Sequence, residues 1–547
     1  MVNRFLKGTF ILTIAGFVVK AIGSINWILL SRVLGGEGIG IYQMGFPIYL
    51  LALQISSAGI PIAISIVTAE KVGQLDYTGA KKVFNISFIM LFLTGLLVSL
   101  LMFFSSHWLI SSGFIVEPRA YYSLIALSPA IFFVTLISCY RGYLQGWQLM
   151  TPTAMSQIIE QLLRVVVMLG AAYVLLPLGL GVAAGGASLG AGVGAFGALL
   201  ILIYYYRKLP KMPATTAQPE PLAAERETVG DVEKSEESIN TKFHIKNESA
   251  KSILYRLIKL AVPISLASMM LPLVANLDLF IVPRRLVVAG FTTNEATELF
   301  GYLTGMAVPL INLATIVTAA LATSLVPAIS NAKSANDWKR VFARTSGAMR
   351  LTFVGTIPFA VMLYVLAEPV VTILYNAPKA ATATQILAAA IFFLGLHQVT
   401  TGLLQGLGRP ILPVINMGIA AFCKVLLNWN LTAIPWLGIA GASYATIADI
   451  AFAALLNLFW IKKYTNYFMD WNLVWKNCLS ALIMGLGMFY LYNLVFMGHM
   501  PMAVNMILTA LIGGFLYVIV MAAVKGLTRH DGERLPFVGK YFRDKNA

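Results

Sequence analysis

Three basic side chains, Lys20, Arg164 and Lys424, lie deep inside long apolar runs of the sequence. A cation at the centre of a membrane-spanning helix costs about 2.5 to 3.5 kcal/mol on insertion scales, so each of them suggests a function. Lys20 lies about 16 Å from the beginning of its run, at about 1.5 Å per residue. Ammonium and guanidinium groups bind phosphate strongly. These residues therefore predict a binding site for an anionic group within the apolar region.

A stripe of polar and small residues follows one face of the first apolar run. Its members recur every three or four residues, as on one face of a helix, and they are Thr13, Gly16, Lys20 and Ser24. A second stripe lies 252 residues further on, without the cation, at Ser265, Ser268, Pro272 and Asn276. Because proline removes one helical hydrogen bond, Pro272 predicts a kink. The two stripes predict a polar lining for a substrate path.

Three more charged residues, Arg32, Asp278 and Arg284, lie near the far ends of the same two runs. They either bind the substrate or anchor the helix ends at the membrane surface, and the sequence leaves both interpretations open. The predicted substrate-binding residues are Lys20, Ser24, Arg32, Arg164, Asn276, Asp278, Arg284 and Lys424.

Two carboxylates lie among the deep cations. Glu160 precedes Arg164 by four residues, so the two either form an ion pair on one helical face or line the path. The matching position before Lys424 is Ala420, so we expect Lys424 to be an unpaired cation that faces a cavity. Asp449 is the deepest carboxylate, and it either binds a coupling cation or neutralises Lys424. Asp449 and Glu160 are therefore the predicted ion-coupling residues.

Other polar residues near the helix ends are expected to be structural. Arg141, Glu368 and His397 are assigned to packing, and Gln145 and Gln405 to helix capping. The five histidines are scattered, and the three cysteines show no paired spacing. The sequence therefore predicts neither a metal site, nor a disulfide framework, nor catalytic residues.

The composition is that of a membrane protein. Of the 547 residues, 59% are hydrophobic and 11% are charged, against about 25% charged in a soluble domain. Apolar runs of about 20 to 25 residues repeat through nearly the whole chain, and about 20 such residues span a bilayer. We expect an all-α polytopic membrane protein with fourteen transmembrane helices.

The chain is internally duplicated. Gly-Tyr-Leu-Gln-Gly at 142–146 matches Gly-Leu-Leu-Gln-Gly at 402–406, and Ala-Ile-Phe-Phe occurs at both 130–133 and 390–393, so one offset of 260 relates both pairs. Each copy of the repeat has six helices, an even number, so both copies begin on the same side of the membrane. Such parallel repeats form two bundles in transporters. The expected units are a first six-helix lobe (1–206), a disordered cytoplasmic linker (207–252), a second six-helix lobe (253–465), two extra helices (466–525) and a cytoplasmic tail (526–547).

The basic residues behind the net charge of +16 indicate how the chain is oriented in the membrane. With the N-terminus inside, 31 of the 39 basic residues lie in inner loops, inner helix ends and tails, which predicts that both termini are cytoplasmic. The linker carries eight basic and eight acidic residues, so it is a poor nucleic-acid or lipid-headgroup ligand. No nucleic-acid partner is expected.

Several motifs resemble the stage V sporulation protein B family, which belongs to the multidrug, oligosaccharidyl-lipid and polysaccharide exporter superfamily. They are Phe-Leu-Lys-Gly-Thr at 5–9, Arg-Gly-Tyr-Leu-Gln-Gly at 141–146, and the residues Pro152, Ala154, Met155, Ser156, Gln157, Glu160, Gln161 and Arg164. The resemblance covers roughly residues 1 to 525. It implies two six-helix lobes in a V, with two C-terminal helices as in lipid II flippases. Related flippases place essential arginines on the first helix, where only Lys20 and Arg32 match, by location.

The resemblance also implies export of an undecaprenyl-diphosphate-linked peptidoglycan precursor of the lipid II type, for spore cortex synthesis. The deep cations and the apolar surroundings independently favour a flippase for an anionic lipid that works by alternating access in the cell membrane. We expect no enzyme activity and no cofactor, with coupling to a monovalent cation gradient or to the membrane potential. The expected partners are the lipid-linked glycan, membrane lipids and peptidoglycan polymerases.

Two alternative functions stay open. A multidrug cation antiporter of the same superfamily would need an acidic, aromatic cavity for cationic drugs. A membrane glycosyltransferase or polymerase would need acidic or histidine residues on sizeable outer loops, and the outer loops here are short.

Overall fold

The computed structural model describes residues 2–57, 59–209, 248–495 and 500–526, and every regular element in these ranges is helical. Most of the predicted linker and tail lies outside the described residues, as do the side chains of Thr13 and Ser268 in the two predicted stripes. We call the end of the bundle at which the linker leaves and re-enters the inner end, and the opposite end the outer end.

The first half of the chain forms six long helical elements and one short 3₁₀ turn, η1 (Leu176–Leu178). They are α1 (Val2–Ser57), α2 (Ile60–Gly73), α3 (Tyr77–Ser111), α4 (Ala120–Gly146), α5 (Met150–Leu175) and α6 (Leu180–Arg207). Gly35 breaks α1 because its φ of 67° and ψ of −174° are not helical. This break divides α1 into an inner part before Gly35 and an outer part that continues toward α2.

The second half contains more, shorter elements than predicted. They are α7 (Ala250–Val288), α8 (Thr293–Gly301), a π-helical segment η2 (Tyr302–Ala307), α9 (Val308–Ala314), α10 (Ile316–Ser334), α11 (Trp338–Val365), α12 (Ala367–Tyr375), a 3₁₀ turn η3 (Pro378–Ala380), α13 (Ala381–Leu387), α14 (Ala390–Gly406), α15 (Ile411–Leu431) and α16 (Ile439–Thr465). After them come α17 (Trp471–Tyr490), a π-helical segment η4 (Leu491–Val495) and α18 (Met502–Ala523).

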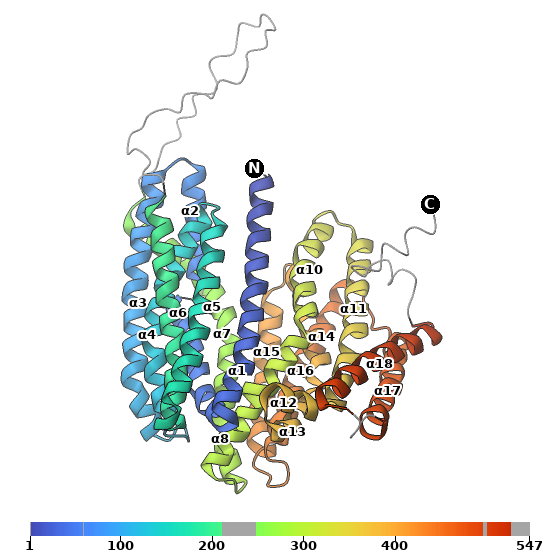
Figure 1. The fold of residues 1–547 in the computed structure, drawn as a ribbon. Coiled ribbons are helices and arrows are strands. Elements are labelled where there is room, and N and C mark those ends of the chain that lie inside the picture. The colour runs from blue at the N-terminus through green and yellow to red at the C-terminus, as the bar shows by residue number, and fades with distance from the viewer. Residues whose placement is uncertain (1, 58, 210–247, 496–499, 527–547) are drawn as a thin grey trace, which may run out of the picture.

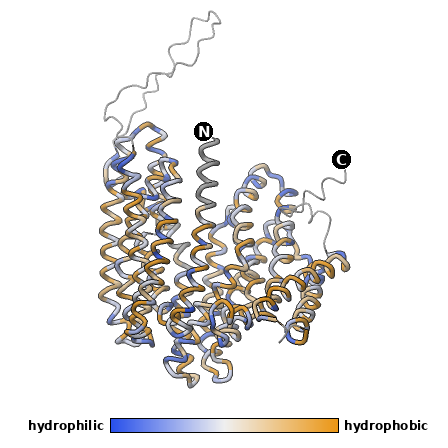
Figure 2. Tube along the Cα trace, viewed as in Figure 1, coloured by the Kyte–Doolittle hydropathy of each residue, from blue (hydrophilic) through white to orange (hydrophobic). Residues whose placement is uncertain are grey.

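The protein is a multi-pass membrane protein. The described residues hold eleven helices long and apolar enough to cross a membrane, or twelve if the bent pair of α13 and α14 is one span. The first of these, Val18–Gly73, includes the break at Gly35. Apolar residues cover the middle of the helices, and polar residues gather at their ends (Figure 2). The number of fourteen spans stays a prediction.

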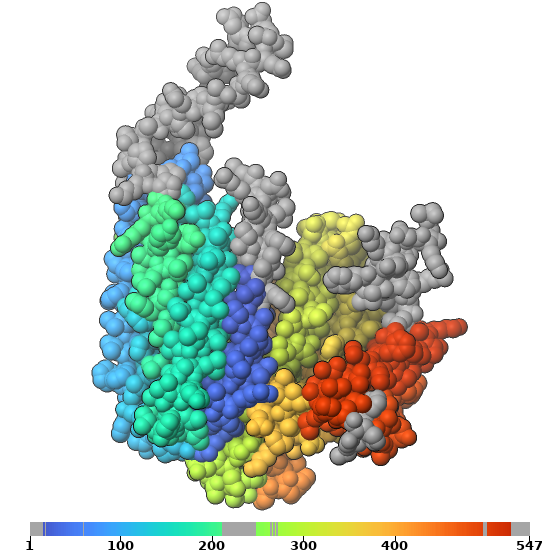
Figure 3. Space-filling model, in the orientation of Figure 1, coloured from blue at the N-terminus to red at the C-terminus, as the bar shows by residue number. Residues whose placement is uncertain are grey.

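Two helical bundles share α1 and α7. One bundle holds α2 to α6, and the other holds α10, α11 and α14 to α16 (Figure 1). Helix α1 packs on α4, α5 and α6, and also on α7, α8 and η2 of the second half. Helix α7 packs on α2 and α3 and also on α15. The extra helices α17 and α18 lie against the second bundle, on the side away from the first (Figure 3).

The outer ends of the two halves are in close contact. A methyl group on Gly40 of α1 would overlap the Thr297 carbonyl of α8, and one on Gly301 would overlap the backbone of α1. Glycine at these positions therefore lets the two backbones meet. Beside this contact, the Thr297 hydroxyl donates to Glu117 over 3.1 Å, and Arg119 pairs with Glu117 at 2.7 Å.

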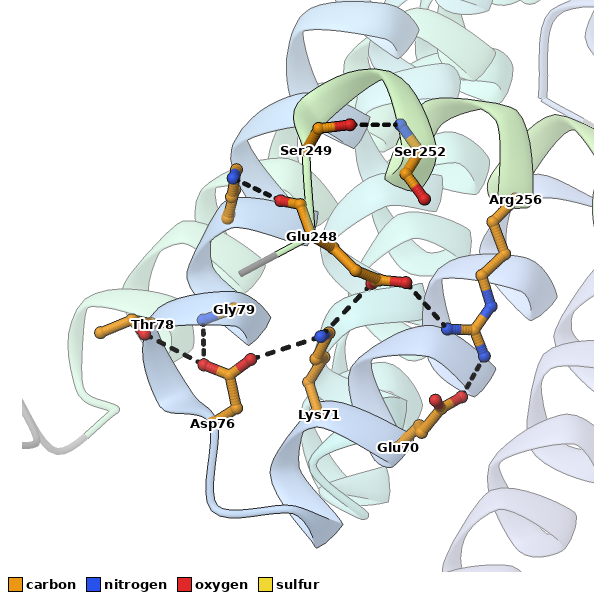
Figure 4. Close-up of polar contacts among 10 residues, drawn as sticks. Glu70, Lys71, Asp76, Thr78, Gly79, Glu248, Ser249, Ser252 and Arg256 are labelled. Carbon is orange, nitrogen blue, oxygen red and sulfur yellow. Dashed lines mark hydrogen bonds and ion pairs between the residues drawn. The ribbon is translucent and has the colours of Figure 1, made fainter. Parts of the chain in front are cut away.

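The inner ends are joined differently. Glu248, just before α7, pairs with Lys71 at 3.3 Å, and Lys71 also lies 3.4 Å from Asp76, which caps α3 (Figure 4). Arg256 of α7 pairs with Glu70 of α2. These contacts attach α7 to the first bundle, whereas no close packing in the described residues joins α10 or α11 to α2–α6. The halves therefore diverge toward the inner end (Figure 1).

Replacing Gly40 tests whether the outer contact holds the two halves together. Gly40→Ala should destabilise the protein by about 1 to 3 kcal/mol, because the added methyl group overpacks a backbone contact. Gly170→Ala is the matched control, since nothing lies within 4 Å of its added methyl group, and a helical alanine is about 0.5 to 1 kcal/mol better than glycine. Equal melting temperatures for the two variants in detergent would contradict this interpretation.

The buried carboxylate of Glu117 predicts a pH dependence. Burial raises its pKa, but hydrogen bonds from Arg119 and Thr297 outweigh burial and hold the pKa below its ordinary range. The stabilisation is therefore complete above the unfolded pKa of about 4.3 and is lost as the pH falls through the lower folded pKa. Glu117→Gln should lower stability at pH 7 by about 1.5 to 3 kcal/mol. Its deficit in melting temperature should shrink below about pH 4, and a constant deficit would exclude this explanation.

Candidate functional site

A charged cluster joins three helices of the second half. Lys424 of α15 places its Nζ 2.7 Å from Asp278 Oδ2 on α7 and 3.8 Å from Asp449 Oδ2 on α16. Asn428 donates its side-chain N–H to the other oxygen of Asp278 over 2.8 Å. Lys424 and Asp449 are each 4% exposed. The expectation of an unpaired Lys424 was wrong, because two carboxylates from other helices neutralise it.

This cluster, Asp278, Lys424 and Asp449, forms part of the wall of a cavity of about 680 Å³. The cavity lies among α7, α9, α10, α14, α15 and α16, and we call it the α14 cavity. Aliphatic side chains make most of its wall. The polar side chains on it outside the cluster are those of Asn312, Thr323, His397, Gln398, Thr401, Gln405 and Thr446.

Sequence reasoning missed the role of α14 in this cavity. His397 was assigned to packing and Gln405 to helix capping, yet both line the cavity with Gln398 and Thr401. The signal that could have found them is spacing, since 397, 401 and 405 follow one another at four residues and 398 lies three residues before 401, which puts them on one helical face.

A second charged cluster lies in the first half. Glu160 accepts from Arg164 at 3.0 Å, which is the ion pair that the four-residue spacing predicts. Arg141 of α4, which is expected to be structural, pairs with the other oxygen of Glu160 at 2.8 Å and also donates to the Ser156 hydroxyl. Two guanidinium groups share one carboxylate, so this cluster carries one net positive charge.

The polar stripe of α1 is exposed at its cation. Lys20 is exposed, and no carboxylate lies within 4 Å of it in the described part of the chain. Ser24 donates to the Lys20 carbonyl of its own helix. On α7, Asn276 is buried and donates to the carbonyls of Pro47 and Pro272, so it ties α7 to the outer part of α1 beside the predicted kink.

The two outer arginines cap carbonyls across the halves. Arg32 of α1 donates to the Leu374 carbonyl of α12 over 2.9 Å, and Arg284 of α7 donates to the Gly113 carbonyl over 3.0 Å. This geometry gives both side chains an anchoring role at the outer end. Substrate contact by Arg32 or Arg284 stays a prediction.

The apolar spans, the two helical halves and the charged clusters within the spans define a multi-pass membrane transporter. The model of the family described as "Polysaccharide biosynthesis protein" matches residues 5–333, and that of "Lipid II flippase MurJ" matches residues 301–512. Stage V sporulation protein B of Bacillus subtilis (strain 168) is 30% identical over 84% of both chains. The chain therefore belongs to the stage V sporulation protein B family, within the multidrug, oligosaccharidyl-lipid and polysaccharide exporter superfamily.

Other relatives agree with this assignment. Lipid II flippase MurJ of Bacillus subtilis (strain 168) is 25% identical over 98% of both chains. A solved structure of lipid II flippase MurJ in an inward closed conformation matches with a TM-score of 0.68 and 17% identity, over 94% of this chain and 98% of that one. An inward-facing multidrug resistance MATE family transporter matches with a TM-score of 0.62 and 16% identity, over 82% and 94%. The relatives of stated activity are flippases and transporters, so the chain is a transporter and not an enzyme.

Removing Lys424 tests the charge balance of the second half. Lys424→Met leaves two buried carboxylates without their counter-charge, so it should destabilise the protein by about 3 to 5 kcal/mol. Adding Asp278→Asn and Asp449→Asn should recover most of this loss in melting temperature. Lys379→Met is the control, because Lys379 is 76% exposed. A triple variant no more stable than Lys424→Met would contradict the pairing.

Proposed function

We propose that this transporter is a lipid-linked oligosaccharide flippase for an undecaprenyl-diphosphate-linked peptidoglycan precursor of the lipid II type. The observation that carries the proposal is the surplus positive charge of the first half. Among the residues that the structure describes, Lys20 is exposed without an ion pair, and Arg141 and Arg164 share the single carboxylate of Glu160. A diphosphate provides the anionic oxygens that such groups bind best. The flippases among its relatives act on a lipid-linked substrate of this kind.

The arrangement of the halves suits entry from the cytoplasm. The halves diverge at the inner end, which the charge pattern places in the cytoplasm, and meet at the outer end. A polar head can therefore enter between the halves while its polyprenyl tail stays in the surrounding bilayer. The surface toward that bilayer is apolar, with exposed side chains such as Leu97, Phe104 and Leu486.

Release on the other side requires the outer contact to open. In alternating access, α1 would bend at Gly35 and α7 near Pro272, since these positions carry a non-helical φ/ψ pair and a proline. The ties made by Arg32 and Arg284 would break as the inner ends close. Coupling to a monovalent cation gradient or to the membrane potential, cytoplasmic termini, a role in spore cortex synthesis and cooperation with peptidoglycan polymerases are further parts of this proposal.

A multidrug cation antiporter is the second candidate. The cluster of Asp278, Lys424 and Asp449 favours it, since two carboxylates face one ammonium beside a cavity. No Phe, Tyr or Trp side chain lines the α14 cavity in the described part of the chain, whereas flat cationic drugs are held by such aromatic rings. The flippase is therefore the better supported function.

Lys20 gives the most direct mutational test. In proteoliposomes with labelled lipid-linked precursor, Lys20→Ala should slow translocation about 10-fold or more, since a hydrogen bond to a charged group is worth about 1.5 to 3 kcal/mol. Lys379→Ala, on an exposed outer position, should keep the wild-type rate. An unchanged rate for Lys20→Ala would exclude this cation from the substrate path, and uptake of a fluorescent organic cation that depends on Asp449 would favour the antiporter.

A further inference from the structure

We propose that the α14 cavity binds a positively charged amine of the transported molecule, while the first half binds its anionic group. This inference rests on the proposed function, because it names the substrate class more closely. The substrate would be a lipid-linked diphosphate glycan that carries a free amine. It would contact both halves of the protein at once.

The charge of the cavity wall is the first argument. Asp278 and Asp449 carry two negative charges against the single positive charge of Lys424, so the cluster has one net negative charge when all three are ionised. The two charged clusters therefore carry opposite surplus charges, because the Arg141, Glu160 and Arg164 cluster is net positive. A molecule that bears both an anion and an ammonium group complements this arrangement.

Unpartnered acceptors are the second argument. Asp449 Oδ1 and Asn428 Oδ1 are buried and accept no hydrogen bond in the structure. Asp449 is 4% exposed and lines the cavity, and Asn428 is joined to the cluster through Asp278. An ammonium group has three N–H donors and no acceptor, so it matches acceptors that lack a donor.

The volume of the cavity and the position of Lys424 favour an organic amine over a bare metal ion as the ligand. A volume of about 680 Å³ is that of a small-molecule site. The Lys424 ammonium already occupies the place between the two carboxylates, so a metal ion could not be coordinated by both. An amine on a flexible arm can reach Asp449 from the cavity, while Gln398, Thr401 and Gln405 offer hydrogen bonds to the rest of that arm.

Binding at both halves has a mechanistic consequence. A substrate with separated charges would link the first half, through its diphosphate, to the second half, through its amine. Its binding energy would then favour the arrangement of the halves that fits the distance between the two groups. Loss of the amine would weaken transport without removing diphosphate binding.

The test compares two forms of one substrate in proteoliposomes. A lipid-linked diphosphate glycan with a free amine on its peptide is measured beside the same molecule with that amine N-acetylated. The wild-type protein should translocate the free-amine form at least about 10-fold faster at subsaturating concentration. Asp449→Asn should reduce this preference to about 2-fold or less, while the control Asp337→Asn, at a partly exposed helix cap outside the cavity, should retain it.

Each outcome separates this inference from the proposed function. Equal rates for the two forms would overturn the amine site and leave the flippase proposal intact. Translocation of neither form would overturn the flippase proposal itself. The comparison in the wild-type protein needs no variant, so it decides the matter even if Asp449→Asn fails to fold. A preference that disappears when Na⁺ is replaced by choline would show a metal cation at this site and overturn the amine assignment.

Discussion

The close approach of α1 and α8 at the outer end is the constraint on which the rest of the structure depends. Glycine at positions 40 and 301 lets the two backbones touch, and any side chain there would hold them apart. Because the halves are fixed at this end, the ties made by Arg32 and Arg284 form across it, and the inner ends diverge. The direction in which the protein is open therefore follows from a contact between backbones.

The charged clusters within the membrane spans connect this shape to the proposed function. Charges within membrane spans are expensive, and six of them here form one net positive cluster and one net negative cluster in opposite halves. Pairing within each cluster makes the charges tolerable, and the surplus of each sign remains for a ligand. Helix α7 contacts both halves. At the inner end, Glu248 and Arg256 pair with residues of α2, and farther out Asp278 pairs with Lys424 of α15. A movement of either half would therefore act on α7.

The all-helical membrane fold and the family could be predicted from the sequence because they depend on patterns along the chain. The break of α1 at Gly35 follows from the local sequence, since polar and glycine-rich residues interrupt the apolar run there. The pair of Glu160 and Arg164 was also predictable, because four residues set their distance. By contrast, Lys424 and Asp278 are 146 residues apart, and no local pattern reveals that they meet. The short helices α8, α9, α12 and α13 likewise depend on tertiary packing.

The central claim is that the first half binds the diphosphate of a lipid-linked substrate between the two halves. The most direct measurement is a density map of the protein with such a substrate bound. The account predicts diphosphate density within hydrogen-bonding distance of Lys20 or of the Arg141 and Arg164 guanidinium groups, with the polyprenyl tail outside the bundle. Diphosphate density in the α14 cavity at Lys424, with none at these first-half cations, would contradict it.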